Sequence, residues 1–425
     1  MITEIALLLL NAIWPIVLLV VLYRSFIVYL LAWRQSEYEE KQSWTILELQ
    51  IPREIKQSAK AMDQVLQVLH TVNDDPTDLI KKYWIGQKTL PISFEMVSFG
   101  GEVHFYVRIL STHRQVVETA FFSFYPDVEV HEVEDYMKQL PETVKELRMQ
   151  GKEAFSMDLK LNREGAYPIK SYVDFSGGEE ETSGDPISVF LEVLGKLKDG
   201  EFLAIHIHGV PLDAKKRKKK YESLVKELRK DPEPGATTFP GFRTDEENRS
   251  LSALERNLSK PAFNTAVRFA YVAPKAIFSG GFPRRGVISA FNQYAAADRN
   301  SFALNWPAGP YGDVWHWPHI FPDLRTKLRG QRTWLNFRFR NCGAIDDLPD
   351  VLGAHPINSN KNLQAIELST EGLATIFHPP TQAVLTAPHT KRVESRKGAA
   401  PAGAPIFAEE KEIEEFTRVG QEGEN

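Results

Sequence analysis

The chain has 425 residues, of which 43% are hydrophobic and 25% charged, a globular composition that excludes wholesale disorder, collagen-like repeats and a polytopic transporter. Its single cysteine, Cys342, cannot form an internal disulfide, which excludes a stapled secreted scaffold and favours a reducing compartment. The net charge of −5 resides in residues 408–425, which carry seven acidic and two basic side chains. The remainder is neutral overall and has no global basic field for nucleic acid.

The N-terminal segment gives the strongest single signal. Residues 5–23 contain no charge, and nineteen residues in a helix match a hydrocarbon core of about 30 Å. The start lacks the basic residues of a cleaved signal peptide. Glu4 precedes the apolar run whereas Arg24 and Arg34 follow it, so the positive-inside rule places the N-terminus outside and the bulk of the chain in the cytoplasm.

We therefore predict that residues 1–40 form a single-pass transmembrane anchor and juxtamembrane segment in the inner (plasma) membrane of the cell. The lipid bilayer is then the first predicted partner of the protein. The alternative is a buried core helix, but such helices are rarely this long and free of charge.

Residues 41–145 show strand and helix periodicities in the order β-α-β-β-α-β. Gly100 and Gly101 lie between the two middle strands and give a strong hairpin signal. This order is that of the split motif found in ferredoxin-like folds, so we predict a ferredoxin-like α+β domain here. The predicted strands are 44–51, 91–99, 103–110 and 128–133, and the predicted helices are 58–72 and 113–125.

A similar pattern with long insertions predicts a second split α+β domain over residues 146–388. Its predicted strands are 154–161, 201–210, 262–273 and 302–305, and its helices are 186–197, 214–230, 244–259 and 286–297. Residues 306–388 are rich in proline, glycine and tryptophan and are expected to be irregular, apart from a strand at 333–339. Residues 389–425 are rich in proline, alanine and glycine and then acidic, which predicts a disordered tail.

The sequence lacks the common motifs of catalysis and cofactor binding. No G-x-x-x-x-G-K-[ST] loop, no G-x-G-x-x-G after a strand, no H-E-x-x-H and no G-x-S-x-G occurs. Without a loop that cradles phosphates and a hydroxyl that binds Mg²⁺, a P-loop ATPase is close to excluded. We therefore predict no catalytic residues, no cofactor and no metal, and hence a protein that is not an enzyme.

Two groups of potential metal ligands were weighed against simpler interpretations. His206 and His208 share one face of a predicted strand, and His316 and His319 flank a tryptophan-rich turn, but no ligand spacing joins the two pairs. We expect the first pair to line a sheet and the second to pack on the domain. Asp346, Asp347 and Asp350 are expected to form a solvated turn.

A run of six basic residues at the start of the predicted helix 214–230 is the main candidate binding site. Such a run can bind phosphates of nucleic acid or of anionic lipid, at about 1 kcal/mol per residue near a membrane. The alternative is a solvated helix face balanced by Glu222 and Glu227. The run consists of Lys215, Lys216, Arg217, Lys218, Lys219 and Lys220.

Phe105 and Tyr106, on a central predicted strand, are typical of sheets that stack on RNA bases. The sequence around them lacks the K/R-G-F/Y-G/A-F-V-x-F/Y pattern of such sheets, which argues against RNA binding.

Several apolar segments follow the anchor in a recognisable order. They are Leu-Glu-Leu-Gln-Ile-Pro-Arg-Glu (47–54), Ile-Ser-Phe-Glu-Met-Val-Ser-Phe (92–99), Val-His-Phe-Tyr-Val (103–107), Phe-Tyr-Pro-Asp-Val-Glu-Val (124–130) and Val-Glu-Asp-Tyr (133–136). With the anchor, they resemble the N-terminal region of membrane-anchored type IV secretion and conjugation-type ATPases of small-genome candidate-phylum bacteria. Residues 368–381 resemble the segment before the motor domain of those ATPases, and residues 390–405 the linker into it.

The resemblance extends to about residue 406, but no HerA/FtsK-class motor domain with a Walker A loop follows, so no nucleotide-binding residue can be carried over. It implies a non-catalytic scaffold or adaptor of a type IV secretion, DNA-transfer or pilus-type apparatus. We expect a homo-oligomer that works with a separate motor ATPase or with secretion or pilus subunits. The alternative is a membrane-tethered nucleic-acid-binding module that uses helix 214–230; an unrecognised enzyme has no residue constellation to support it.

Overall fold

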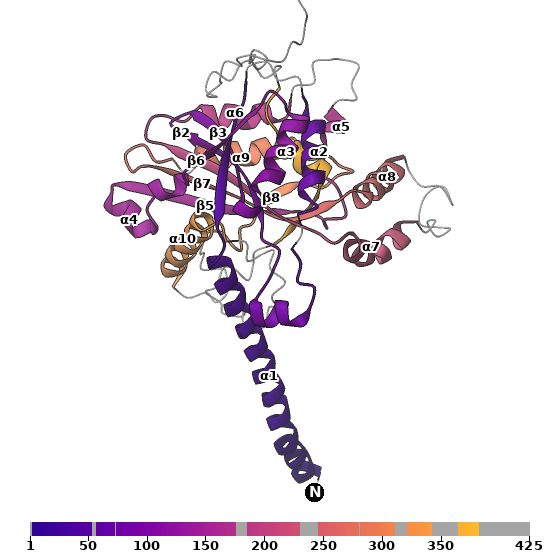
Figure 1. Cartoon of the computed structure of the whole chain (residues 1–425). Coiled ribbons are helices and arrows are strands. Elements are labelled where there is room, and N and C mark those ends of the chain that lie inside the picture. Colours follow the sequence, from indigo (N-terminus) through magenta and orange to yellow (C-terminus); the bar gives the residue numbers. More distant parts are fainter. Residues whose placement is uncertain are drawn as a thin grey trace, which may run out of the picture.

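The computed structural model describes residues 2–52, 57–72, 74–175, 185–229, 245–279, 281–310, 321–341 and 364–381. A mixed α/β body is built on an antiparallel sheet, and the N-terminal helix α1 (Ile2–Glu40) projects from it (Figure 1). Among the described residues, α1 is the one helix long and apolar enough to cross a membrane. It continues beyond the apolar run to Glu40, so one unbroken helix connects the predicted anchor to the body.

The first unit of the body follows the predicted element order. Its strands lie in the order β4-β1-β3-β2, and all neighbours are antiparallel. Gly100 and Gly101 form the β2–β3 turn with φ of 57° and 99°, which glycine adopts without strain. The elements are β1 (Trp44–Gln50), α2 (Ala59–Leu69), β2 (Ile92–Phe99), β3 (Glu102–Leu110), α3 (Arg114–Phe124) and β4 (Glu129–Val133).

The second unit repeats this arrangement. Its strands lie in the order β8-β5-β7-β6, which is again fourth, first, third and second along the chain. Two extra helices, α7 (Ala214–Arg229) and α8 (Asp245–Ser259), stand where the first unit has its Gly-Gly turn. The other elements are β5 (Lys152–Leu161), α5 (Tyr172–Phe175), α6 (Ile187–Gly195), β6 (Phe202–Pro211), β7 (Ala262–Pro274), α9 (Gly281–Asn292) and β8 (Phe302–Leu304).

The two units join edge to edge in one nine-stranded sheet. Strands β2 and β6 pair antiparallel, from Ile92 opposite Gly209 to Phe99 opposite Phe202. The ninth strand, β9 (Ile366–Ser369), pairs with the start of β7. The regions predicted as separate domains are therefore two halves of a continuous sheet.

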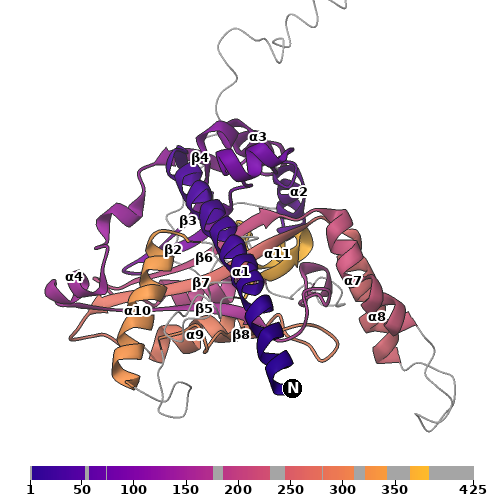
Figure 2. The ribbon, with the colours of Figure 1, turned by 90° about the horizontal axis from the view of Figure 1, so that it is seen from below.

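Helices cover both faces of the sheet. The main core lies between the sheet and helices α2, α3, α6, α9 and α11 (Thr370–Ile376). These helices are amphipathic: in α2, for example, Met62, Val65, Leu66 and Leu69 are buried at helical spacing. The opposite face carries a smaller core under η3 (Tyr136–Gln139), α4 (Val144–Met149) and α10 (Pro322–Arg338). Figure 2 shows this second face, with α1 in front of it.

Strand β9 and helix α11 link the two units. β9 extends the sheet from β7 of the second unit, whereas α11 packs against α2 of the first. Phe377, just after α11, contacts Phe94 and Phe105 with ring centroids 5.2 and 5.8 Å away. This short segment thus closes the core where the two units meet.

The strand predicted at 333–339 is wrong, because these residues belong to helix α10. The alternation of apolar and polar residues there imitates a strand, but Pro322 at the first turn and buried residues at helical spacing specify a helix. Its buried face includes Arg325, Arg329, Thr333 and Trp334. The region 306–388 is consequently less irregular than predicted, since it also contains β9 and α11.

Helix α9 lies at Gly281–Asn292 and not at the predicted 286–297. Pro283 stands in its first turn, where proline is tolerated. At Gly286 an added Cβ would lie 3.0 Å from a methyl group of Val193, so glycine allows close packing on α6. Thr244, the first residue of the predicted helix 244–259, and the predicted tail 389–425 lie outside the described residues.

A row of polar side chains crosses the sheet on the face that carries α10. Residues opposite each other in paired strands point to the same face, so each member of this polar row neighbours the next. Its centre, Glu95 beside His206, lies at the β2–β6 join, and both side chains are fully buried. The row consists of His131, Glu48, Tyr106, Glu95, His206, Arg268 and Asp158.

Arg340, which follows α10, neutralises the buried Glu95. Its guanidinium donates to both carboxylate oxygens of Glu95, at 2.6 and 3.1 Å, and to both of Asp135, at 2.8 and 3.0 Å. Although burial alone would raise the pKa of the Glu95 carboxyl, Arg340 holds that pKa well below its usual range. Arg340 has a φ of 53°, a left-handed conformation at the end of the helix. These contacts tie α10 to the sheet and to η3.

We expect Arg340→Ala to lower the free energy of unfolding by about 3–5 kcal/mol, because it leaves the Glu95 carboxylate buried without its cation. Denaturant unfolding of the detergent-solubilised chain measures this. In the control, Arg338→Ala, the loss should be much smaller, since the half-buried Arg338 donates one long bond to the Leu140 carbonyl, 3.3 Å away. The double variant Glu95→Gln, Arg340→Met should recover part of the loss. Equal losses in the two single variants would contradict the assignment.

Candidate functional site: the basic helical hairpin

The predicted basic helix is α7, and it forms a hairpin with α8 at one side of the body (Figures 1 and 2). Asp213 begins α7 by accepting the backbone N–H groups of Lys215 and Lys216 at 2.7 and 2.9 Å. These hydrogen bonds lower the pKa of the Asp213 carboxyl. A small apolar cluster around Ala166, Tyr221 and Leu254 holds the two helices against the body. We call α7 and α8 the basic hairpin.

The six basic residues of the predicted site do not act alike. Arg217 is buried, donates to the Asn257 carbonyl at 2.9 Å and lies 3.7 Å from the carboxylate of Glu367. Lys220 also pairs with Glu367. These two residues fix α7 to strand β9, which contains Glu367. The remaining four side chains are exposed on the hairpin surface: Lys215, Lys216, Lys218 and Lys219.

Three cavities in the described part of the chain adjoin the basic hairpin. One, of about 550 Å³, lies beside Lys220 and Tyr221, and one, of about 480 Å³, lies beside Glu246 and Arg249 of α8. The third, of about 220 Å³, lies between α8, α5 and α11 and is lined by Arg249, Arg256 and Arg299. Arg256 pairs with Glu371 at 2.8 Å and Arg299 with Asp174 at 3.2 Å. Because carboxylates already pair with two of these three arginines, the four exposed lysines of α7 are the larger group of cations that can bind an anion.

The predicted position of His206 and His208 on one sheet face is confirmed, with both rings buried. Nε2 of His206 lies 2.7 Å from the hydroxyl of Tyr136, which donates to Glu95, so His206 donates to Tyr136. Burial lowers the pKa of His206 to about 3, and the ring is neutral. Among the described residues, no three His, Cys, Asp or Glu side chains form a group that could hold a metal ion. His316, His319, Asp346, Asp347 and Asp350 lie outside those residues.

Phe105 and Tyr106 are both buried. Phe105 lies under Phe377, and Tyr106 stacks on Tyr136 with centroids 5.1 Å apart. Neither of these two rings is available to stack on a nucleic-acid base in the observed conformation.

The charged cluster beneath the sheet was not predicted from the sequence. Glu95, Asp135 and Arg340 come together there, and only the helical placement of α10 brings Arg340 close, 245 positions after Glu95. The one sequence signal was Glu95 itself, the single charged residue in a strand whose other residues are five apolar side chains and two serines.

No protein-family model matches this chain, and no curated protein is significantly similar to it. The assignment of function therefore depends on the residues and the geometry described above.

His208 predicts a specific loss of stability in acid. In the described part of the chain, neither ring nitrogen of this buried residue has a hydrogen-bond partner, and burial holds its pKa well below the ordinary 6.5. His208 therefore binds a proton near pH 6.5 in the unfolded chain but not in the folded chain. As a result, the free energy of unfolding falls as the pH drops below that value.

Between about pH 7 and pH 5, His208 should lower the unfolding free energy of the original chain by about 2 kcal/mol. We expect this part of the decrease to be absent in His208→Leu. Denaturant midpoints at both pH values measure this difference. At about pH 7 the variant should be at least as stable as the original chain, because it buries no unpartnered imidazole. The exposed His131→Gln is the control and should keep the full acid dependence. An unchanged acid dependence in His208→Leu would show that the folded chain accepts the proton.

Charge reversal of the four exposed lysines of α7 should weaken binding to phosphate groups without unfolding the chain. We expect lower affinity for DNA and for vesicles containing phosphatidylglycerol. The slope of log affinity for DNA against log salt concentration should become shallower by about 0.9 for each phosphate that α7 no longer binds. Binding of the full chain in neutral-lipid nanodiscs measures both. The substitutions are Lys215→Glu, Lys216→Glu, Lys218→Glu and Lys219→Glu.

A matched control changes the net charge equally at exposed lysines elsewhere: Lys138→Glu, Lys145→Glu, Lys196→Glu and Lys198→Glu. Equal weakening in both sets would indicate a general charge effect. Unchanged binding in the α7 set would identify the hairpin surface as a solvated face.

Proposed function

We propose that this protein is a membrane-anchored, non-catalytic scaffold or adaptor. The observation that carries the proposal is α1, whose apolar side chains are exposed from Ile13 to Tyr23 while its other end enters a rigid two-unit body. Exposing these apolar side chains to water is unfavourable in free energy, whereas the apolar core of a bilayer would cover them without this penalty. The proposed arrangement is a platform of two ferredoxin-like units held at a fixed place beneath the membrane.

The charges beside the apolar run support the orientation. Glu4 precedes the run, and Arg24 and Arg34 follow it, so we place the N-terminus outside and the body in the cytoplasm at the inner membrane. The resemblance described above further suggests a type IV secretion, DNA-transfer or pilus-type apparatus, in which a separate motor ATPase binds the platform. The chain itself has no P-loop to bind nucleotide phosphates.

The exposed lysines of α7 favour one second candidate, a membrane-tethered nucleic-acid-binding module. The salt dependence separates the two candidates. When a protein binds phosphates, the logarithm of its affinity falls linearly with the logarithm of the salt concentration. The affinity between subunits that join through buried apolar surface changes little with salt.

Cross-linking and co-purification of the tagged full chain test the scaffold proposal. We expect a stoichiometric ATPase or other secretion or pilus subunits in the eluate, retained at high salt, while the purified chain itself hydrolyses no ATP above background. Deletion of residues 388–425 should weaken recruitment of that subunit and leave the anchor and body intact.

As a topology control, protease added outside intact cells should leave the body uncut, and permeabilised cells should lose it. ATP hydrolysis by the isolated chain, or nucleic acid as the sole salt-sensitive companion, would overturn the proposal.

A further inference from the structure

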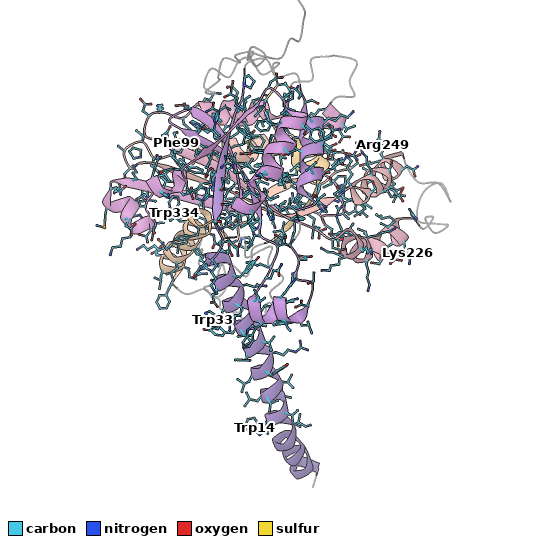
Figure 3. The ribbon with its side chains drawn as sticks, in the orientation of Figure 1. Trp14, Trp33, Phe99, Lys226, Arg249 and Trp334 are labelled. Carbon is cyan, nitrogen blue, oxygen red and sulfur yellow. The ribbon has the colours of Figure 1, made fainter. Side chains whose placement is uncertain are left out.

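A short helical turn, η1 (Lys81–Ile85), lies beside α1 and well below the sheet (Figure 1). It belongs to the connection between α2 and β2. Figure 3 shows Trp33 of α1 at the level of this turn. The turn therefore lies outside the two-unit body, on the side from which α1 projects.

The backbone of this connection is pressed directly against α1. Gly86 has a φ of 77°, and a Cβ added there would lie 2.3 Å from the carbonyl oxygen of Arg34. Only glycine fits such an approach. The Arg34 guanidinium lies over the rings of Trp33 and Trp84, with its carbon 4.7 and 5.3 Å from their centroids. These contacts fix η1 at one height along α1.

Large apolar side chains on this connection are exposed. Leu79, Ile80 and Trp84 are 74%, 69% and 68% exposed. The adjoining turns of α1 expose Phe26, Tyr29 and Trp33 as well, so the apolar surface of α1 continues onto the turn. Soluble surfaces rarely carry such a patch unless something covers it.

The height of the patch matches the edge of a bilayer. The α1 residues 5–33 carry one charge, Arg24, and in a helix they extend about 43 Å, close to a bilayer thickness of about 40–45 Å with headgroups. If this stretch occupies the membrane, Arg24 lies within the cytoplasmic half of the bilayer, where its long side chain reaches the headgroups, and Trp33 and η1 fall at the level of those headgroups.

The composition of the turn suits that level. Lys81 and Lys82 stand between the exposed apolar residues, and Tyr83 and Trp84 follow them. Tryptophan and tyrosine concentrate at membrane–water interfaces, and lysine there reaches anionic lipid phosphates.

We propose that residues 79–85, which we call the interfacial loop, form a second membrane contact that inserts into the cytoplasmic headgroup region beside α1. Two contacts fix the depth and tilt of α1, and so hold the sheet in one orientation beneath the bilayer, where a single helix would leave it free to swivel. This inference rests on the proposed membrane anchoring.

Depth-dependent quenching of the full chain in vesicles of phosphatidylcholine and phosphatidylglycerol tests it. In a Cys342→Ser background, an environment-sensitive fluorophore is attached at Ile80→Cys, at Ile16→Cys within α1, or at Lys218→Cys on α7. Lipids brominated in the acyl chains then quench the probes. We expect quenching at position 80 several-fold stronger than at 218 and weaker than at 16.

Quenching at position 16 without quenching at position 80 would contradict the proposed membrane contact of the interfacial loop but not the proposed membrane anchor. The same result is expected if a protein, and not lipid, covers the patch. Absence of quenching at 16 as well would overturn the proposed membrane anchoring.

Gly86→Ala provides a second test that keeps every apolar side chain. Because the added methyl group collides with the α1 backbone, it should displace the interfacial loop and reduce quenching at position 80. The control is Gly330→Ala in α10, where the nearest atom to an added Cβ is 3.6 Å away. Undiminished quenching in Gly86→Ala would overturn the role of α1 in placing the loop.

Discussion

A buried carboxylate at the join of the two units controls how the lower face of the sheet is built. Glu95 lies where β2 meets β6, away from water, and a charge in that place is tolerated only with a close cation. Arg340 supplies the cation, and its left-handed backbone brings the end of α10 against the sheet. Asp135 shares the same guanidinium and brings η3 with it. One charge requirement thus places the end of α10 and the start of η3 against the sheet.

A buried ion pair of this kind adds little net stability, because desolvation offsets much of the attraction. The apolar core above the sheet supplies the driving force for folding. The polar row, by contrast, fixes register: a shift of one residue between β2 and β6 would put Glu95 and His206 on opposite faces of the sheet, so that one of them would enter the apolar core. We infer that the row determines which edge-to-edge pairing the two similar units adopt.

Local patterns predicted much of this fold, and non-local contacts account for what they missed. The elements between residues 44 and 133 follow from their periodicity and the Gly-Gly turn. Residues 333–339 alternate like a strand, and only the buried face that α10 shares with the sheet makes them helical. The basic run was visible, but its division into structural and exposed residues depends on Glu367, which joins α7 only in the folded chain. The interfacial loop is recognised by the exposure of its apolar side chains, which the sequence alone does not give.

The segment β9–α11 has a consequence for the order of events during synthesis. The chain is made from its N-terminus, so α1 and both units leave the ribosome before residues 366–377 exist. Until then Phe94 and Phe105 lack the ring of Phe377 that covers them, and β7 lacks its β9 partner. At ordinary rates of translation, roughly 15 to 50 seconds separate Phe105 from Phe377. The nascent protein passes this interval with the core between the two units open.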